Sequence, residues 1–293
     1  MSSINLPLIL TLAVFVTGLV WLYDALVLAK PRKQKLDAVD KQFERANLAD
    51  KHQKEAYQQA RDAAGKEPVW VEYSKSFFPV LALVFVLRSF IAEPFQIPSG
   101  SMEPTLEVGD FIVVNKFTYG IRLPVLNTEV IPVNKPERGE VMVFFPPHQP
   151  ETYFIKRVIG LPGDTVTYID HQLTINGEPV EEEVIDVNRS ARPAYRVVRE
   201  TLGDNTYTVR KHLEPSRYSQ YGSWVVPEGH YFMMGDNRDG SHDSRGWNEL
   251  NRGSGPDLSF VSEDAIVGKA FAIWMHWDSL FSVPSFERAG AIH

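Results

Sequence analysis

The stretch "ETYFIKRVIGLPGDTVTYID", residues 151–170, gives the strongest indication of the fold. It holds two runs rich in Val, Ile, Thr and Tyr, separated by a Gly/Pro turn at residues 160–164. This composition is typical of β-strands joined by a tight turn. Because side chains alternate along a strand, Lys156 shares one face with Phe154 and Val158. A lysine between two apolar neighbours is a candidate for burial, although most strand lysines are solvated or protect an edge.

Strand-like runs separated by Gly/Pro turns extend in both directions from this stretch, and Asn176-Gly177 is a hairpin turn signal. Residues 181–227 are polar with weak periodicity, and we interpret them as a peripheral insertion. The frequent short strands predict a mainly β region from Phe95 onward. The other predicted strands lie within residues 110–119, 139–147, 173–175 and 267–277.

Composition argues against several function classes. The 293 residues are 44% hydrophobic and 23% charged, which is typical of a globular protein with a large core. The formal net charge of −7 argues against a general nucleic-acid-binding protein, since such proteins are usually basic. The chain has no cysteine, so it has no disulfide, no thiolate nucleophile and no Cys-ligated metal.

The N-terminal run Leu6 to Tyr23, "LPLILTLAVFVTGLVWLY", carries no charge and is long enough to cross a bilayer. A cleaved signal peptide is the alternative, but the basic region that should precede such a peptide is missing. The positive charges instead follow the run, at Lys30, Arg32, Lys33 and Lys35. We therefore predict an uncleaved transmembrane helix within residues 1–29.

A second apolar run, residues 76–92, is shorter and is interrupted by Arg88. Long cationic side chains near a helix end can extend to the lipid headgroups, so a second span is predicted. The alternative is a buried helix of a soluble domain. The basic residues of the connecting segment, 30–75, predict that this loop is cytoplasmic and that residues 93–293 are not.

The segment "QIPSGSMEPT", residues 96–105, carries Ser99 and Ser101 between two prolines, so its backbone is stiff. A serine becomes a good nucleophile only when a base takes its proton. His242, in "DGSHDSRGW", is one candidate base, but its turn-forming neighbours suggest an exposed loop residue. Lys156 is the other candidate, and it would have to be neutral in an apolar pocket.

Three blocks together resemble the bacterial type I signal peptidases: "PSGSMEPTLEVGDFIVVNKFTYG", "IKRVIGLPGDTV" and "MGDNRDGSHDSRGW". Their order and spacing agree with that family, as do the two preceding apolar runs and the ending "GAIH". The resemblance implies a mainly β catalytic domain anchored by two transmembrane helices. It also implies an inserted smaller β domain, residues 165–226, and neither a cofactor nor a metal.

The activity implied by the resemblance is a serine endopeptidase with a Ser/Lys dyad. It would remove signal peptides from exported preproteins after small residues, at the outer face of the bacterial cytoplasmic membrane, in contact with membrane lipids. By this match Ser101 is the nucleophile, Lys156 is the general base and Ser241 orients the lysine. The Ser99 hydroxyl would join the Ser101 backbone N–H in stabilising the oxyanion.

The resemblance further assigns a supporting salt bridge to Asp243 and Arg245, and it requires no histidine at position 242. Small residues precede the cleavage site of a signal peptide, so a shallow apolar pocket is expected. By family similarity its lining would be Phe95, Ile97, Pro98, Leu106, Ile112, Val143 and Ile155. Two other function classes stay open: a Ser/His hydrolase built on His242, and a membrane-tethered β-domain that binds without catalysis.

Overall fold

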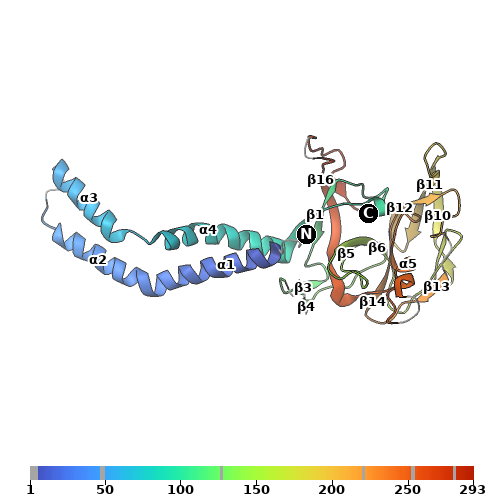
Figure 1. Cartoon of the computed structure of the whole chain (residues 1–293), viewed down its shortest axis with the longest axis horizontal. Coiled ribbons are helices and arrows are strands. Elements are labelled where there is room, and N and C mark those ends of the chain that lie inside the picture. Colours follow the sequence, from blue (N-terminus) through green and yellow to red (C-terminus); the bar gives the residue numbers. More distant parts are fainter. Residues whose placement is uncertain (1–5, 47–49, 126–127, 220–221, 252–254, 280–281) are drawn as a thin grey trace. The chain divides into compact units, whose positions relative to one another are not determined.

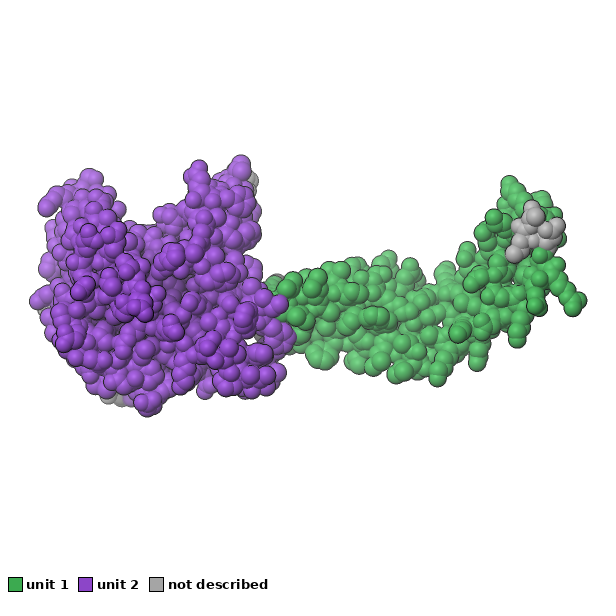
Figure 2. Space-filling view, turned by 180° about the vertical axis from the view of Figure 1, so that it is seen from behind, with its two compact units in different colours: residues 1–88 green, residues 89–293 purple. Residues whose placement is uncertain are grey.

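The computed structural model describes residues 6–46, 50–125, 128–219, 222–251, 255–279 and 282–293 (Figure 1). The chain divides into two compact units, residues 1–88 and residues 89–293, which Figure 2 shows in different colours. The first unit is helical and the second is mainly β.

The first unit pairs two long apolar helices. Helix α1 (Leu6–Tyr23) packs against α4 (Val69–Val86), and the rings of Trp21 and Phe78 meet edge to face at 5.2 Å. By length and composition, the continuous helices Leu6–Gln42 and Val69–Ile91 are candidate membrane spans. The remaining helical elements are the π-helical turns Asp24–Leu28 and Leu87–Ile91 and the helices α2 (Ala29–Gln42) and α3 (Lys51–Gly65).

The second apolar helix begins earlier than the predicted residue 76. It starts at Val69 and ends at Ile91, and the next residue already belongs to a strand. The predicted run begins immediately after Lys75. In the structure the Lys75 ammonium lies 2.5 Å from the buried Asp24 carboxylate and 2.8 Å from that of Glu67. The charge is therefore paired within the helical unit and does not interrupt the helix.

The second unit is built on an eight-stranded antiparallel sheet of order β1-β2-β16-β5-β6-β14-β15, with β17 paired to β16 (Figure 1). Register shifts along β16 mark bulges, which bend a strand and let this long one pair with β2 and with β5. The strands are β1 (Ala92–Gln96), β2 (Asp110–Asn115), β5 (Val141–Phe144), β6 (Phe154–Gly160), β14 (His230–Met234), β15 (Val261–Ser262), β16 (Ile266–His276) and β17 (Gly290–Ala291).

Three smaller sheets complete the unit. One has the order β13-β7-β8-β9, one has the order β10-β11-β12, and one is the pair β3-β4. Their strands are β3 (Gly120–Arg122), β4 (Glu129–Pro132), β7 (Thr165–Ile169), β8 (Gln172–Ile175), β9 (Glu178–Pro179), β10 (Glu181–Asn188), β11 (Tyr195–Leu202), β12 (Asn205–His212) and β13 (Gly222–Val225). The only α-helix among the described residues of this unit is the short α5 (Ser244–Trp247).

The hairpin predicted at Asn176-Gly177 is confirmed. These two residues join β8 to β9 with φ values of 53° and 87°, the left-handed backbone that this turn type requires. The predicted runs also contain β2, β5, β6, β7, β8 and β16.

The three eight-residue strands β10 to β12 were not recognised, because their inward positions are not uniformly apolar. Strands β11 and β12 do alternate between buried and exposed residues. However, Glu200 and Lys211 occupy buried positions, and neither is exposed to solvent. A pattern with charges inside has no period-two hydrophobic signal, which is why residues 181–227 read as a polar insertion.

One hydrophobic cluster joins two of the smaller sheets to the main sheet. It contains Ile159 of β6 and Phe232 of β14 together with Val166 of β7 and Val198 of β11. A second hydrophobic cluster is formed by side chains of β2, β5 and β16, and Phe95 of β1 packs against it. The sheet β10–β12 therefore shares a hydrophobic cluster with the strand that carries Lys156.

Candidate active site

Lys156 and Ser101 meet although 55 residues separate them. Strand β6 places Lys156 with 4% of its surface exposed, and its Nζ donates a hydrogen bond of 2.6 Å to Ser101 Oγ. Nζ also donates to the Ile155 carbonyl oxygen at 3.0 Å and lies 5.6 Å from the centre of the Phe154 ring. The amine is thus held in an apolar setting with its donor directed at a hydroxyl.

This setting changes the protonation of the lysine. Burial of the ammonium lowers the pKa of Lys156 to about 8, against the attraction of the Asp243 and Asp236 carboxylates, while the Arg245 guanidinium adds to the lowering. A lysine with this pKa is substantially neutral at mildly alkaline pH. It is therefore able to accept a proton from Ser101.

The turn that carries Ser101 is fixed by a second segment, residues 235–237. Asn237 N–H donates to the Ser101 carbonyl oxygen at 3.1 Å, and Asn237 Nδ2 donates to the Gly100 carbonyl oxygen at 2.9 Å. Gly235 lies so close that a Cβ there would overlap the Ser101 carbonyl oxygen and the Ser241 hydroxyl. The glycine is needed for this close approach.

A buried ion pair ties the same segment to β6. Arg157, adjacent to Lys156, donates from Nε and Nη2 to the two carboxylate oxygens of Asp236, at 2.8 and 2.7 Å. Neither side chain is exposed to solvent. The Thr105 hydroxyl donates to Asp236 Oδ2 at 2.5 Å. Strand β6, the turn that carries Ser101 and residues 235–237 therefore share one hydrogen-bonded network.

The expected salt bridge between Asp243 and Arg245 is present. Arg245 donates from Nε and Nη2 to the carboxylate, both at 2.8 Å, and both side chains are buried. Burial alone would raise the pKa of Asp243, but the Arg245 guanidinium and hydrogen bonds to the carboxylate hold it below its usual range.

Ser241 is placed differently from the expectation. Its side chain is fully buried beside Gly235 and contributes to the lowered pKa of Asp243. Its Oγ nevertheless has no partner in hydrogen-bonding geometry among the described residues. The orienting bond to Lys156 implied by the resemblance is therefore not formed in this structure.

Ser99 precedes the short 3₁₀ turn Gly100–Met102, with an extended backbone at φ −147° and ψ 154°. Its side chain is exposed, two residues before Ser101. Met102, on the other side of Ser101, is buried and anchors the turn in the hydrophobic cluster of the main sheet.

The seven residues expected to line a substrate pocket fall into two groups. Four are buried in the main-sheet cluster: Ile97, Leu106, Ile112 and Val143. Phe95 and Ile155 pack half-buried against that cluster, and Pro98 is exposed. The sequence analysis missed two aromatic neighbours, since Tyr153 lies 5.2 Å from Phe95 and 4.6 Å from Phe145, measured between ring centres.

His242 is half-buried, not exposed as its turn-rich context suggested. Its ring packs edge to face on His148 at 5.4 Å, and His148 packs in turn on Trp247. The only hydrogen-bond donor seen at the Ser101 hydroxyl, within the described part of the chain, is Lys156. The geometry therefore favours the lysine over the histidine as the base.

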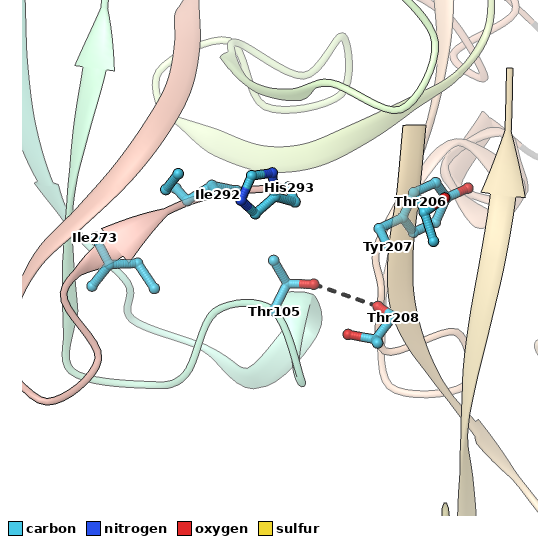
Figure 3. Close-up of a pocket in the computed structure, with 8 residues that line it drawn as sticks. Thr105, Thr206, Tyr207, Thr208, Ile273, Ile292 and His293 are labelled. Carbon is cyan, nitrogen blue, oxygen red and sulfur yellow. Dashed lines mark hydrogen bonds between the residues drawn. The ribbon is translucent and has the colours of Figure 1, made fainter. Parts of the chain in front are cut away.

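A pocket of about 250 Å³ lies where the residues after the nucleophile turn approach β12 and the last residues of the chain. Figure 3 shows Thr105 facing Thr208 across it, with a hydrogen bond of 3.4 Å to the Thr208 carbonyl oxygen. None of the residues predicted for substrate binding lines this pocket. Within the described ranges, no cluster of three His or acidic residues is arranged to hold a metal ion.

The residues that sequence reasoning missed are Arg157, Gly235, Asp236 and Asn237. All four lie within the motif blocks "IKRVIGLPGDTV" and "MGDNRDGSHDSRGW". The sequence Gly-Asp-Asn-Arg at residues 235–238 is typical of a turn, and this was the one local signal for these residues. Nothing in the sequence indicates that this turn contacts Ser101.

Comparison with known proteins gives a consistent set of similarities. Residues 70–277 match the family described as signal peptidase, peptidase S26. The signal peptidase I of Pseudomonas aeruginosa is 47% identical over 294 residues, which cover 99% of this chain and 100% of its own. The signal peptidase I of Haemophilus influenzae is 39% identical over 255 residues, covering 70% of this chain and 69% of its own. Among solved structures, a signal peptidase I from Enterococcus faecalis is 32% identical and covers 47% of this chain and 97% of its own, with a TM-score of 0.28.

The role of Gly235 can be tested by substitution. Gly235→Ala should lower kcat for preprotein cleavage about 100-fold, because the added methyl displaces the Ser101 turn and a misplacement of about 1 Å has a cost of that order. Gly290→Ala is the control, since a Cβ at Gly290 meets nothing within 4 Å. Steady-state kinetics of the two variants give the result, and equal kcat values would contradict the role assigned to Gly235.

Proposed function

The chain belongs to the signal peptidase family, peptidase S26, and we propose that it cleaves signal peptides from exported preproteins with Ser101 and Lys156 as a catalytic dyad. The observation that carries this proposal is the 2.6 Å hydrogen bond from Lys156 Nζ to Ser101 Oγ at a buried site. The lowered pKa of the lysine supports the same assignment.

In the proposed reaction, neutral Lys156 takes the proton of Ser101 Oγ as this oxygen attacks the carbonyl carbon of the small residue that precedes the scissile bond. The tetrahedral intermediate then expels the amine of the mature protein, which receives the proton from the lysine. The signal peptide is left as an ester on Ser101. Lys156 next takes a proton from water, whose oxygen attacks the ester, and the proton returns to the serine.

Two donors are proposed for the oxyanion of the tetrahedral intermediate: the backbone N–H of Ser101 and the hydroxyl of Ser99. Preorganised donors stabilise this charge at little reorganisation cost. The bonds from Asn237 to the carbonyl oxygens of Gly100 and Ser101 support this role, because they hold the peptide groups of the turn in place.

The preference for small residues is proposed to come from the seven pocket residues described above. Their half-buried members, Phe95 and Ile155, pack against the buried main-sheet cluster and stay partly accessible to a substrate side chain. Strand β1 is the terminal strand of its sheet, so an extended signal peptide can add to its free edge.

We further propose that the protein spans the bacterial cytoplasmic membrane twice, with residues 30–75 in the cytoplasm and residues 93–293 on the outer face. The two apolar helices and the basic residues after the first one support this orientation. The region 165–226, which includes the sheets of β7 to β13, is proposed as the inserted smaller β domain.

Lys156→Arg should reduce kcat/KM by about 10²- to 10⁴-fold, the usual contribution of a general base, because arginine keeps its proton at any working pH. For the wild type, kcat/KM should rise with pH through about 8 and then level off, since the deprotonated lysine is the active form. The matched control is Lys269→Arg, a strand lysine paired with Glu140, which should stay near normal. An active Lys156→Arg enzyme combined with an inactive His242→Ala enzyme would transfer the role to the histidine.

Ser99→Ala should lower kcat by about 10²- to 10³-fold with little change in KM, which is the typical effect of losing one oxyanion donor. Ser99→Thr keeps a hydroxyl and should keep much of the activity. A loss confined to KM, or a normal kcat in the alanine variant, would show that Ser99 only shapes the turn.

The proposed orientation predicts a specific pattern of protease sensitivity. Protease added to spheroplasts should digest the region after Ala92 and leave residues 30–75 intact, as judged by antibodies to each region. Lysed cells serve as the control in which both regions become accessible. Digestion of residues 30–75 alone in intact spheroplasts would reverse the orientation.

A further inference from the structure

The sheet β10–β12 carries charges where a protein core usually carries apolar side chains. Glu200 of β11 accepts hydrogen bonds from Arg238 Nη1 and Nη2 at 2.8 and 2.6 Å, and Lys211 Nζ of β12 lies 3.0 Å from the same carboxylate. None of these three side chains is exposed to solvent. Lys211 also pairs with Glu182 of β10, so the cluster contains two positive and two negative charges.

The cluster reaches directly into the segment that holds the nucleophile. Arg238 follows Asn237, whose N–H binds the Ser101 carbonyl oxygen. The backbone of β12 lies alongside, because Arg210 N–H donates to the Asp236 carbonyl oxygen at 2.8 Å and Arg238 N–H donates to the Arg210 carbonyl oxygen at 2.9 Å. Residues 236–238 are therefore held from the sheet β10–β12 by backbone and by side chain.

The same arginine is linked to the second half of the site. The Arg238 carbonyl oxygen accepts a 2.7 Å hydrogen bond from Arg245 Nη2, and Arg245 pairs with Asp243. Asp243 and Arg245 are among the charges that set the pKa of Lys156. Movement of Arg238 would consequently alter both the backbone at Ser101 and the electrostatics at Lys156.

Stability alone is a weak reason for this arrangement. Replacing a buried ion pair by well-packed apolar residues of similar volume is often neutral or stabilising. An apolar pair would, however, leave residues 236–238 without the two directed bonds between Glu200 and Arg238. The charge pair fixes an orientation that apolar packing does not.

We infer that Glu200 is a positioning residue through which the sheet β10–β12 holds residues 235–238, and hence the Ser101 turn, in the reactive geometry. The inference rests on the proposed dyad function and gives the inserted region a role in catalysis. Glu200 acts through Arg238 and does not contact the substrate.

The test compares two glutamates on neighbouring strands of one sheet. Glu200→Gln should lower kcat for preprotein cleavage about 10- to 100-fold with KM nearly unchanged, because misplacement at the reacting centre affects the chemical step. Glu183→Gln is the matched control, since Glu183 is exposed and pairs only with Arg199 in the bonds seen among described residues. Its kcat should stay within about twofold of wild type. Circular dichroism and thermal melting check that each variant is folded.

A double-substitution cycle separates positioning from general destabilisation. If Glu200 acts through the bonds to the Ser101 turn, Glu200→Gln and Asn237→Ala should be strongly non-additive in kcat. Additive effects, or a folded Glu200→Gln enzyme with normal kcat, would overturn the inference. The charge-balanced variant Glu200→Met/Arg238→Met covers the case in which Glu200→Gln does not fold. It should melt near the wild-type temperature but still lose kcat, and normal kcat in that variant would also overturn the inference.

Failure of the proposed function has a different signature. In that case Ser101→Ala would cleave the preprotein as fast as wild type. The Ser101→Ala variant therefore tests the proposed function, whereas the ratio of the Glu200→Gln and Glu183→Gln rates tests the positioning role of Glu200.

Discussion

The chemistry proposed for the site depends on the burial of one ammonium group, that of Lys156, away from water. In the proposed dyad Lys156 acts as a base only while its charged form is disfavoured, and burial disfavours that form. Two carboxylates nevertheless lie near enough to oppose the effect, Asp236 and Asp243. Each is bound in bidentate fashion by its own guanidinium, from Arg157 and Arg245 respectively. The two arginines limit the attraction that these carboxylates exert on the lysine, so the carboxylates can hold the backbone without restoring the charge.

A lowered lysine pKa also has a cost in stability. The pKa of Lys156 is about 8 in the folded protein and 10.5 in its ordinary state. Between these values the unfolded chain binds a proton that the folded site does not, so stability rises with pH across that window. Below about pH 8 the site destabilises the fold by roughly 3 kcal/mol. On the same strand, Ile159 belongs to one hydrophobic cluster and Ile155 packs against another.

The sequence predicted the parts of the fold that follow from local patterns. The strand with Lys156 between Phe154 and Val158, the Asn176-Gly177 hairpin and four of the eight main-sheet strands, β2, β5, β6 and β16, were found in this way. Strands β11 and β12 were missed because Glu200 and Lys211 stand at inward positions. The contact of Asn237 with Gly100 joins residues 137 positions apart, and no local pattern encodes it.

Strand β1 leads directly into the turn that carries Ser101, the proposed nucleophile. The pairing of β1 with β2 continues to Ile97, whose N–H donates to the Asp110 carbonyl oxygen at 2.8 Å and whose carbonyl accepts from Gly109 N–H at 3.0 Å. Only Pro98, Ser99 and Gly100 then separate the last paired residue from Ser101. Proline restricts the first of these, and bonds to Asn237 fix the last. In the proposed binding mode, the register of a peptide that pairs with the outer edge of β1 determines which of its bonds faces Ser101 Oγ.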